Sequence, residues 1–341
     1  MNAITLTTGL IERTPIPDSV VRLGIVALCE RTNRKLAAAS GTANRDFAAA
    51  TASLPIAEHV DDANTQHYEV PAAFFENVLG PQRKYSCCLF RSPDDDLAAA
   101  EEHALAETAA HAALADGQAI LELGCGWGSL SLWMARHYTA ARIVAVSNSH
   151  SQRDFIEAKA KAEGLTNLTV RTADMNAFKP GETFDRIVSV EMFEHMLNWR
   201  RLLGRVRSWL KADGRFFMHV FTHDCAPYRF DHHDKEDWIA QHFFTGGVMP
   251  SHGFIHEFSD ALAVEQDWRW SGTHYRDTAR QWLTNFDDNA GAVRRLLAEV
   301  YGTDAALWLR RWRLFFLATE GLFGYANGTV WGVSHYRLKP V

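Results

Sequence analysis

The chain has 341 residues, which is enough for about two domains, or for one large domain that carries an insertion. Hydrophobic residues make up 47% and charged residues 22%, and 11 Trp and 20 Phe need burial, so the composition excludes a disordered chain. The net charge of −6 excludes a general basic field, and no nucleic-acid partner is expected. Five cysteines, an odd number, do not indicate a disulfide framework and favour a cytoplasmic location.

The N-terminal segments lack the pattern of an export signal or a membrane span. Met1–Arg13 has no basic stretch that leads into an apolar core. Ser19–Ala38 is apolar at helical spacing but also carries charged residues, and no other stretch reaches about 18 uninterrupted apolar residues. We therefore expect a soluble protein without stable membrane insertion.

Residues 1–112 predict an N-terminal helical cap, because alanine-rich runs are separated by prolines that break helices. After residue 112, short apolar runs alternate with segments of helical periodicity. Strands are expected at Ala119–Leu123, Arg142–Val146, Leu168–Arg171, Phe184–Val190 and Gly214–Phe221, and helices at Ser129–Tyr138, Ser151–Glu163 and Leu202–Leu210. This alternation predicts an α/β fold with a parallel sheet, helices on both faces, and a core over residues 113–223.

The alternation stops at Asp224. The stretch from there to His256 is rich in His, Phe, Asp and Gly, and it predicts an inserted lid. Beyond it we expect a strand at Leu262–Trp270, helices at His274–Asn289 and Thr303–Tyr325, and a last strand at Thr329–Leu338. Residues 224–341 therefore predict the lid together with the elements that complete the sheet, closed by the last strand as an antiparallel edge.

A glycine-rich loop follows the first expected strand, where Leu121–Gly128 has the sequence LELGCGWG. Glycines allow a tight turn and let a ligand approach the backbone, and the next helix presents free N–H groups at its N-terminus. The spacing G-x-G-x-G is one residue tighter than the dinucleotide pattern, and Glu122 lies at the end of the strand. The combination resembles motif I of the class I S-adenosylmethionine-dependent methyltransferases. An ordinary strand-to-helix turn is the alternative for the glycines alone.

Polar residues follow the next two strands. The second strand leads into Ser147–Ser149, where an acid usually holds ribose hydroxyls, and the amides of Asn148 and Gln152 are suited to replace it. After the third strand, Asp174 offers a carboxylate for the adenine amino group and Met175 an apolar side chain for the ring. Taken alone, Asp174 is better explained as a helix cap.

Several segments in a fixed order carry a family resemblance. They are Gln66–Pro71 (QHYEVP), Lys84–Cys88 (KYSCC), Leu121–Gly128, Val190–Met196 (VEMFEHM), Phe243–Ser251 (FFTGGVMPS) and Phe323–Gly328 (FGYANG). Together with Asn148 and Gln152 they resemble the cyclopropane-fatty-acid synthase superfamily of methyltransferases, and within it the coclaurine N-methyltransferase group. The resemblance covers about residues 66–340 and implies a class I, Rossmann-like methyltransferase core of seven strands with S-adenosylmethionine as cofactor.

The resemblance also implies the residues of the site. Those that line the cofactor site are Tyr85, Ser86, Gly124, Gly126, Asn148, Gln152 and Asp174. Met175 is added because it follows Asp174 directly. It implies that Glu191, Glu194 and His195 face the substrate. The expected partner is a small aromatic or alkaloid-like amine, and a homodimer is left open beside a monomer.

Glu191, Glu194 and His195 directly follow the fourth strand, and open α/β sheets bind ligands at the carboxyl ends of their strands. An amine becomes positively charged as it takes a methyl group, and a carboxylate stabilises that charge. The amine must first lose a proton, which suits a histidine with a pKa of about 6.5. We predict Glu194 as the orienting acid, His195 as the base and Glu191 as a second anionic contact. In the alternative, Glu191 caps the following helix and His195 is a surface group.

Methylation of a lipid alkene is the competing reaction. Cyclopropane synthases bind bicarbonate with a cysteine, a glutamate, a histidine and a tyrosine, and this chain has matching types at Cys87, Glu194, His219 and Tyr275. The synthases carry glycine where this chain has Glu191, and an added carboxylate suits a cationic substrate better than a lipid carbocation. We therefore favour the amine, with Cys87, His219 and Tyr275 as substrate-binding residues.

Three aromatic residues near the C-terminus, Phe323, Tyr325 and Trp331, are candidates for a wall that binds an amine through ring faces. Core packing is the alternative for each of them. A binding protein that kept the cofactor site and lost catalysis is disfavoured, because the Glu194–His195 pair is intact by type.

A metal site is not expected. His219 and His223, with the Asp-His-His-Asp run at 231–234, match no zinc pattern, and the cysteines form no C-x-x-C.

Overall fold

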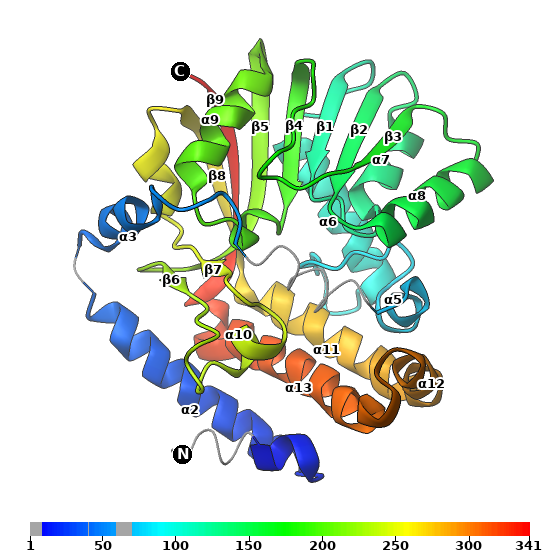
Figure 1. The fold of residues 1–341 in the computed structure, drawn as a ribbon, viewed down its shortest axis with the longest axis vertical. Helices are drawn as coiled ribbons and strands as arrows, with labels where there is room; N and C mark the ends of the chain where they lie inside the picture. Colours follow the sequence, from blue (N-terminus) through cyan, green and yellow to red (C-terminus); the bar gives the residue numbers. More distant parts are fainter. Residues whose placement is uncertain (1–8, 40, 59–69) are drawn as a thin grey trace.

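The computed structural model describes residues 9–39, 41–58 and 70–341. At its centre lies a seven-stranded sheet in the order β3-β2-β1-β4-β5-β9-β8 (Figure 1). The strands are β1 (Ala119–Leu123), β2 (Arg142–Ser147), β3 (Leu168–Thr172), β4 (Phe184–Val190), β5 (Leu210–His223), β8 (Leu262–Ser271) and β9 (Trp331–Pro340). The first five are parallel, and β9 pairs antiparallel with both β5 and β8.

The sheet is buried on both faces because successive residues of its inner strands, which point to opposite faces, are apolar. Ile120, Ile143, Val188 and Phe217 pack on one face with helices α6 (Leu97–His111) and α7 (Ser129–His137). The neighbouring positions Leu121, Val144, Ile187 and Phe216 pack on the other face with α9 (Trp199–Trp209). Helix α8 (His150–Ala162) packs through Ile156 and Ala160 in a further cluster with Ala145 and Val170 of the sheet. Continuous apolar strands of this kind are typical of a parallel sheet with helices on both sides.

A second layer of helices lies beyond one end of the sheet (Figure 1). Helices α11 (Gly272–Asp288), α12 (Ala290–Tyr301) and α13 (Ala305–Gly324) lie there, with α5 (Ala72–Val78) and α2 (Asp18–Ala37) packed against them. The segment between β5 and β8 contains β6 (Tyr228–Arg229), α10 (Trp238–His242), β7 (Val248–Met249) and the 3₁₀ turn Phe254–Phe258. The short helix α3 (Ala43–Thr51) packs against that turn, with Phe47 and Phe254 edge to face at 5.5 Å.

The predicted α/β fold with seven strands is confirmed, and most element boundaries differ by one to three residues. One prediction was wrong. The last strand is not an edge but lies between β5 and β8, because β9 is buried along most of its length while β8 exposes a charged stretch, which suits an edge. Helix α12, which was not predicted, follows α11 after a single residue, Asn289, and buries Val293 and Leu297.

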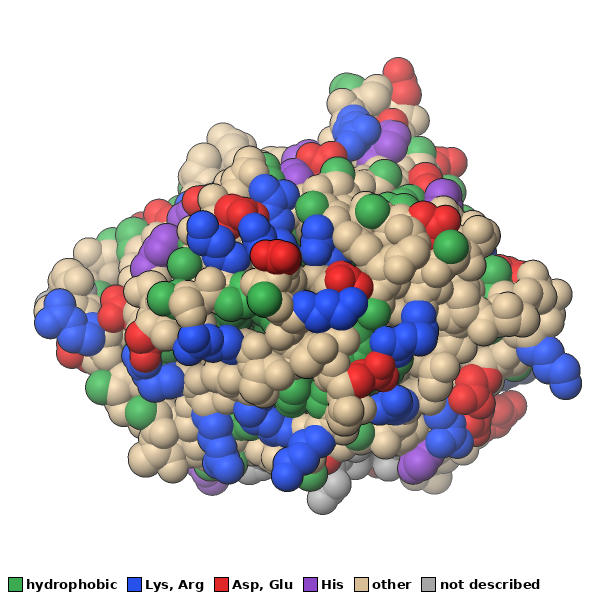
Figure 2. All heavy atoms as spheres, turned by 90° about the horizontal axis from the view of Figure 1, so that it is seen from above, with side chains coloured by type: hydrophobic (Ala, Val, Ile, Leu, Met, Phe, Trp, Pro, Cys, Tyr) green, Lys and Arg blue, Asp and Glu red, His purple; other side chains and the backbone are tan. Residues whose placement is uncertain are grey.

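The face in Figure 2 shows Lys and Arg side chains interspersed with Asp and Glu, without an area of one sign. The ion pair Arg337–Glu265 joins the neighbouring strands β9 and β8 at 2.8 Å, and Arg215–Glu265 joins β5 to β8 across β9 at 3.0 Å. Among the described residues, none of the helices combines the length and apolar character that crossing a bilayer requires.

Candidate active site

The glycine loop turns between β1 and α7 with three residues in the left-handed region. Gly124, Gly126 and Gly128 have φ of +80°, +52° and +81°. A Cβ on Gly124 would lie 2.5 Å from the Met192 side chain, and one on Gly128 would lie 2.6 Å from Ile156. A Cβ on Gly126 would meet no protein atom within 4 Å. The outer glycines therefore allow close packing, and the middle one leaves space open.

That space belongs to a cavity at the carboxyl ends of β1, β2 and β4. All eight residues predicted for the cofactor line it, namely Tyr85, Ser86, Gly124, Gly126, Asn148, Gln152, Asp174 and Met175. Two of them are positioned by visible contacts. Gln152 accepts a hydrogen bond from the Ser147 hydroxyl at 2.6 Å, and Asp174 accepts from the Asn176 N–H at 2.8 Å. Asp174 therefore caps a turn and lines the cavity as well.

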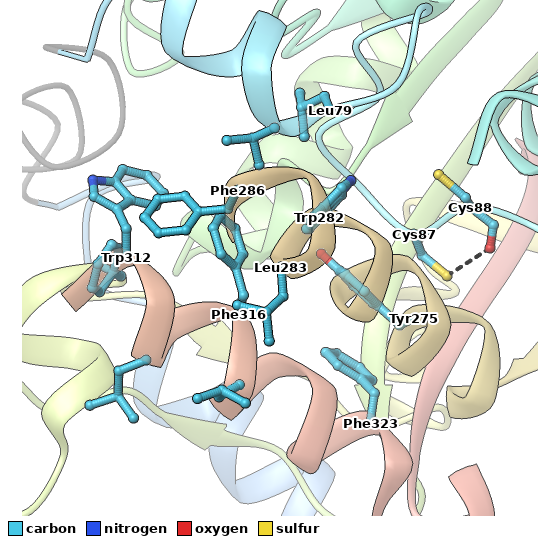
Figure 3. Close-up of a cluster of buried hydrophobic side chains, with 14 of the residues drawn as sticks. Leu79, Cys87, Cys88, Tyr275, Trp282, Leu283, Phe286, Trp312, Phe316 and Phe323 are labelled. Carbon is cyan, nitrogen blue, oxygen red and sulfur yellow. Dashed lines mark hydrogen bonds between the residues drawn. The ribbon is translucent and has the colours of Figure 1, made fainter. Parts of the chain in front are cut away.

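Another part of the cavity wall carries aromatic side chains from distant segments. They are Phe221 of β5, Phe230 and Phe244 of the lid, Tyr275 and Trp282 of α11, and Phe315 and Phe323 of α13. Tyr275 and Phe323 stack with ring centroids 4.2 Å apart, and Figure 3 shows them facing each other from their two helices. A polar, glycine-lined half and an aromatic half thus share one cavity.

Glu191, at the end of β4, lines this cavity and is held by three groups from three other segments. Its Oε1 accepts from the Cys87 N–H at 2.9 Å and lies 3.1 Å from His219 Nε2. Its Oε2 accepts from the Tyr275 hydroxyl at 2.6 Å. The carboxylate is therefore fixed in place and does not cap the following turn.

The backbone of Glu191 has φ of +47°, a conformation that favours glycine and costs other residues about 1–2 kcal/mol. Burial raises the pKa of this carboxyl, while Lys84, the Cys87 N–H and Tyr275 act in the opposite direction. Lys84 is itself 3% exposed and donates to the Ser86 hydroxyl and to the Cys87 carbonyl. A buried cation thus lies next to a buried carboxylate, which keeps the charged form accessible.

The other two predicted catalytic residues lie in different surroundings. His195 lines the cavity, with its ring 4.4 Å from that of Phe244. Glu194 is fully buried and does not line the cavity, because its side chain turns toward β5, where Oε1 accepts from the Phe221 N–H at 2.7 Å. Burial, with Glu191 nearby, raises the pKa of Glu194 well above its usual range. The structure therefore brings Glu191 and His195 to the cavity wall and leaves Glu194 behind it.

The predicted substrate-binding residues divide in the same way. Tyr275 and Phe323 line the cavity. Cys87 and His219 are buried behind Glu191 and do not line the cavity, so they act on it only through the Glu191 carboxylate. Trp331 is buried in β9, where its ring lies beside that of His223, so it packs in the core.

Tyr325 lies outside the lining as well, because its hydroxyl donates to Glu30 on α2. Of the matched segment Gln66–Pro71, residues 66–69 lie outside the described part of the chain.

The motif Lys84–Cys88 is kept in place by a residue that the sequence did not single out. The buried carboxyl of Glu101 on α6 accepts from the N–H groups of Gln82 and Lys84, at 2.7 and 3.1 Å. Burial raises the pKa of Glu101 to about 7. Lys84 itself lies in the motif Lys84–Cys88 on which the family resemblance rests.

The absence of a metal site stays a prediction. In the described ranges, His223, Asp224 and Cys225 have potential ligand atoms within 4.8 Å of one another. His223 Nδ1 accepts from the N–H groups of Cys225 and Ala226.

Comparison with known proteins bears on this geometry. The family model of mycolic acid cyclopropane synthetase matches residues 57–331. The chain belongs to this family. It is 35% identical to (S)-coclaurine N-methyltransferase of Thalictrum flavum subsp. glaucum over 84% of this chain and 81% of that protein. It is 30% identical to cyclopropane-fatty-acyl-phospholipid synthase of Escherichia coli (strain K12) over 65% of this chain and 55% of that protein.

A crystal structure of coclaurine N-methyltransferase bound to N-methylheliamine and SAH superposes with a TM-score of 0.95 at 31% identity, covering 99% of this chain and 100% of that one. The resemblance to the coclaurine N-methyltransferase group is thereby confirmed, and the protein is an S-adenosylmethionine-dependent methyltransferase. The open space above Gly126, the amides of Asn148 and Gln152, and the carboxylate of Asp174 fit this cofactor.

Proposed function

We propose that this methyltransferase transfers the methyl group of S-adenosylmethionine to the nitrogen of a small aromatic or alkaloid-like amine. The aromatic half of the cavity has the character of a pocket for such a molecule, and Glu191 supplies the negative charge that an ammonium group needs. The similarity to (S)-coclaurine N-methyltransferase supports the same substrate class.

One observation carries the choice of an amine over a lipid alkene. The Cys87 N–H, His219 Nε2 and the Tyr275 hydroxyl all contact the two carboxylate oxygens of Glu191. In the lipid reaction, a cysteine, a histidine and a tyrosine of this kind hold bicarbonate. Here a side-chain carboxylate takes up these contacts, at a residue whose positive φ is otherwise suited to glycine. A carboxylate held in this place favours a cationic substrate.

The contacts also favour roles that differ from those expected from the sequence. When bound, S-adenosylmethionine supplies an electrophilic methyl group. Glu191 binds the ammonium group and accepts its proton, because its raised pKa brings it closer to that of the amine. His195 orients the amine from the cavity wall, and Glu194 supports the wall from behind through the Phe221 N–H.

Methyl-labelled S-adenosylmethionine distinguishes the two reactions directly. The protein is supplied with a pool of small aromatic and benzylisoquinoline-type amines, or with vesicles of unsaturated phospholipid. We expect label in the amines only. Label in the lipid would refute the amine proposal, and binding of the cofactor without turnover in either pool would indicate a protein that has lost catalysis.

A further inference from the structure

Three buried histidines form a hydrogen-bonded row that leads away from the active-site carboxylate. His219 Nε2 lies 3.1 Å from Glu191 Oε1, and His219 Nδ1 lies 2.9 Å from His335 Nε2. His335 Nδ1 lies 2.8 Å from His111 Nδ1, and His111 Nε2 lies 3.2 Å from Glu107 Oε1. Every ring nitrogen of the three histidines therefore has a neighbour in the row.

The row runs from the cavity to the surface. His219 and His335 are fully buried, His111 is 9% exposed, and the Glu107 side chain is 30% exposed. The fold fixes the spacing at both ends. His219 on β5 lies opposite His335 on β9 in the antiparallel register, while Glu107 and His111 are four residues apart on α6, one turn along the helix.

We propose that His219, His335 and His111 form a proton relay that connects Glu191 with solvent at Glu107. The inference rests on the proposed function, in which an amine that enters as an ammonium ion gives up one proton before it is methylated. Substrate and cofactor cover the cavity side of Glu191 during the reaction. The relay gives this proton a path to solvent from the side of the Glu191 carboxylate that faces away from the cavity.

Four proton transfers, one along each contact, complete the passage. The proton on Glu191 Oε1 moves to His219 Nε2, that on His219 Nδ1 to His335 Nε2, that on His335 Nδ1 to His111 Nδ1, and that on His111 Nε2 to Glu107 Oε1. Each ring gains one proton and loses one, so it is neutral before and after. Glu191 ends as a carboxylate, and Glu107 releases the proton to water. The passage leaves every ring in the opposite tautomer, so each ring resets by rotation about its Cβ–Cγ bond and proton exchange before a second proton follows.

The surroundings suit neutral rings. Burial lowers the pKa of His219 and His335 well below the usual range and lowers that of His111, with Lys84 acting in the same direction on the first two. Glu107 and Arg337 face His111 with opposite charges. The titratable groups beside Glu191 are Lys84, Cys87, Glu194 and Tyr275.

Two tryptophans pack against the row. Trp268 stacks on His111 at 3.8 Å with an interplanar angle of 8°, and the ring of Trp270 lies 4.3 Å from that of His335. Glu107, whose side chain is 30% exposed, is the most exposed member of the row.

His111→Ala tests the relay in the full-length protein, with the amine that the wild type methylates. We expect kcat to fall by about tenfold or more, while the amine KM and the affinity for S-adenosylmethionine stay unchanged. Added imidazole should restore kcat by filling the space at the edge of the relay. The wild type should show a solvent isotope effect on kcat with a curved dependence on the deuterium fraction, as expected for several protons in flight.

His252→Ala is the matched control, because His252 is a partly buried histidine that contacts Tyr336 and Asp267 and no member of the row. Its kcat should not respond to imidazole. Unchanged kcat in His111→Ala would overturn the relay while leaving the amine reaction intact. Equal losses of kcat and cofactor affinity would also overturn it and assign His111 a structural role.

A measurement without turnover separates the relay from the proposed function. In spectra of ¹⁵N-labelled histidine rings, we expect the signals of His219, His335 and His111 to shift together over the pH range in which Glu191 loses its proton, and to lose this common shift in Glu191→Gln. If only His111 responds to pH in the wild type, the row is not coupled to Glu191 and the relay is refuted, whatever the enzyme methylates.

Discussion

The two halves of the active-site cavity are built in different ways. Six of the eight residues in the cofactor half come from three consecutive junctions after β1, β2 and β3, each of which places its residues within a few positions of the strand end, and Tyr85 and Ser86 come from the segment before α6. The aromatic half, which we assign to the amine and therefore call the amine half, is assembled from the lid, α11, α13 and the end of β5. The Glu191 carboxylate beside it is held by groups that lie 104, 28 and 84 residues away in the chain.

Because the two halves are built differently, changes in them should affect different measured quantities. The cofactor half depends on backbone conformation and short polar side chains, and a change there should affect affinity for S-adenosylmethionine. The amine half depends on a charge fixed by long-range contacts, and a change there should affect turnover or amine affinity while leaving cofactor binding intact. Four predictions test this division, in order of expected effect.

Glu191→Gln should give the largest effect. The amide keeps the shape of the side chain but removes the negative charge and the site for the proton, so we expect kcat to fall by about 10²-fold or more with little change in cofactor affinity. Steady-state kinetics and calorimetric binding measure the two quantities.

Glu194→Gln is the matched control for Glu191→Gln. Glu194 is buried away from the cavity, and its raised pKa favours the neutral acid, so an isosteric amide should keep kcat within about threefold of the wild type. A loss as large as that of Glu191→Gln would return Glu194 to the role of the orienting acid.

Gly126→Val should weaken binding of S-adenosylmethionine by about a hundredfold, because the new side chain would fill open space in the cavity. Gly181→Val is its control, since Gly181 also has a positive φ and open space around it but lies outside the cavity. If both variants bind the cofactor equally poorly, backbone strain explains the loss and the division fails.

Phe323→Leu should raise the amine KM by about three- to tenfold, because it removes the stacking partner of Tyr275 from the aromatic half. Phe316→Leu, on the same helix but in the core (Figure 3), should reduce stability without changing KM. A KM that changes equally in both variants would place the amine elsewhere.

The smallest effect on catalysis is expected at Glu122, which lies in β1 beneath the glycine loop. Burial raises its pKa to about 7, while the Ser131 hydroxyl donates to it. The folded state therefore holds a proton that the unfolded chain has lost, so stability falls by about 1.4 kcal/mol per pH unit between the ordinary pKa of 4.5 and about 7.

Glu122→Gln should flatten this dependence and raise the free energy of unfolding above pH 7, as measured by urea denaturation at pH 5 and pH 8. A variant with the same pH dependence as the wild type would show that other groups cause it.

Local signals in the sequence predicted most of the cofactor half, while Tyr85 and Ser86 were expected only from the family resemblance. Gly124 and Gly126 follow an apolar run, and Asn148 and Asp174 follow the next two, so strand ends that meet at one edge of the sheet predict the site. The order of the C-terminal strands had no such signal, since the position of β9 between β5 and β8 depends on tertiary packing.

The amine half was only partly predictable. The residue types of Glu191, Glu194 and His195 marked a site, but spacing alone could not show that one of the two carboxyls turns away from the cavity. The row from His219 to His111 was also beyond sequence analysis, because it depends on the register between β5 and β9 and on the packing of α6.

The central claim is that the Glu191 carboxylate takes up contacts that would otherwise hold a free anion, and Glu191→Gly tests it most directly. Glycine suits the positive φ, so the backbone should be retained while the carboxylate is lost. We predict that turnover on the amine falls by about 10²-fold or more and recovers partly when bicarbonate or formate is added, because the Cys87 N–H, His219 and Tyr275 remain in place to bind it. Full activity of Glu191→Gly without an added anion would contradict the account.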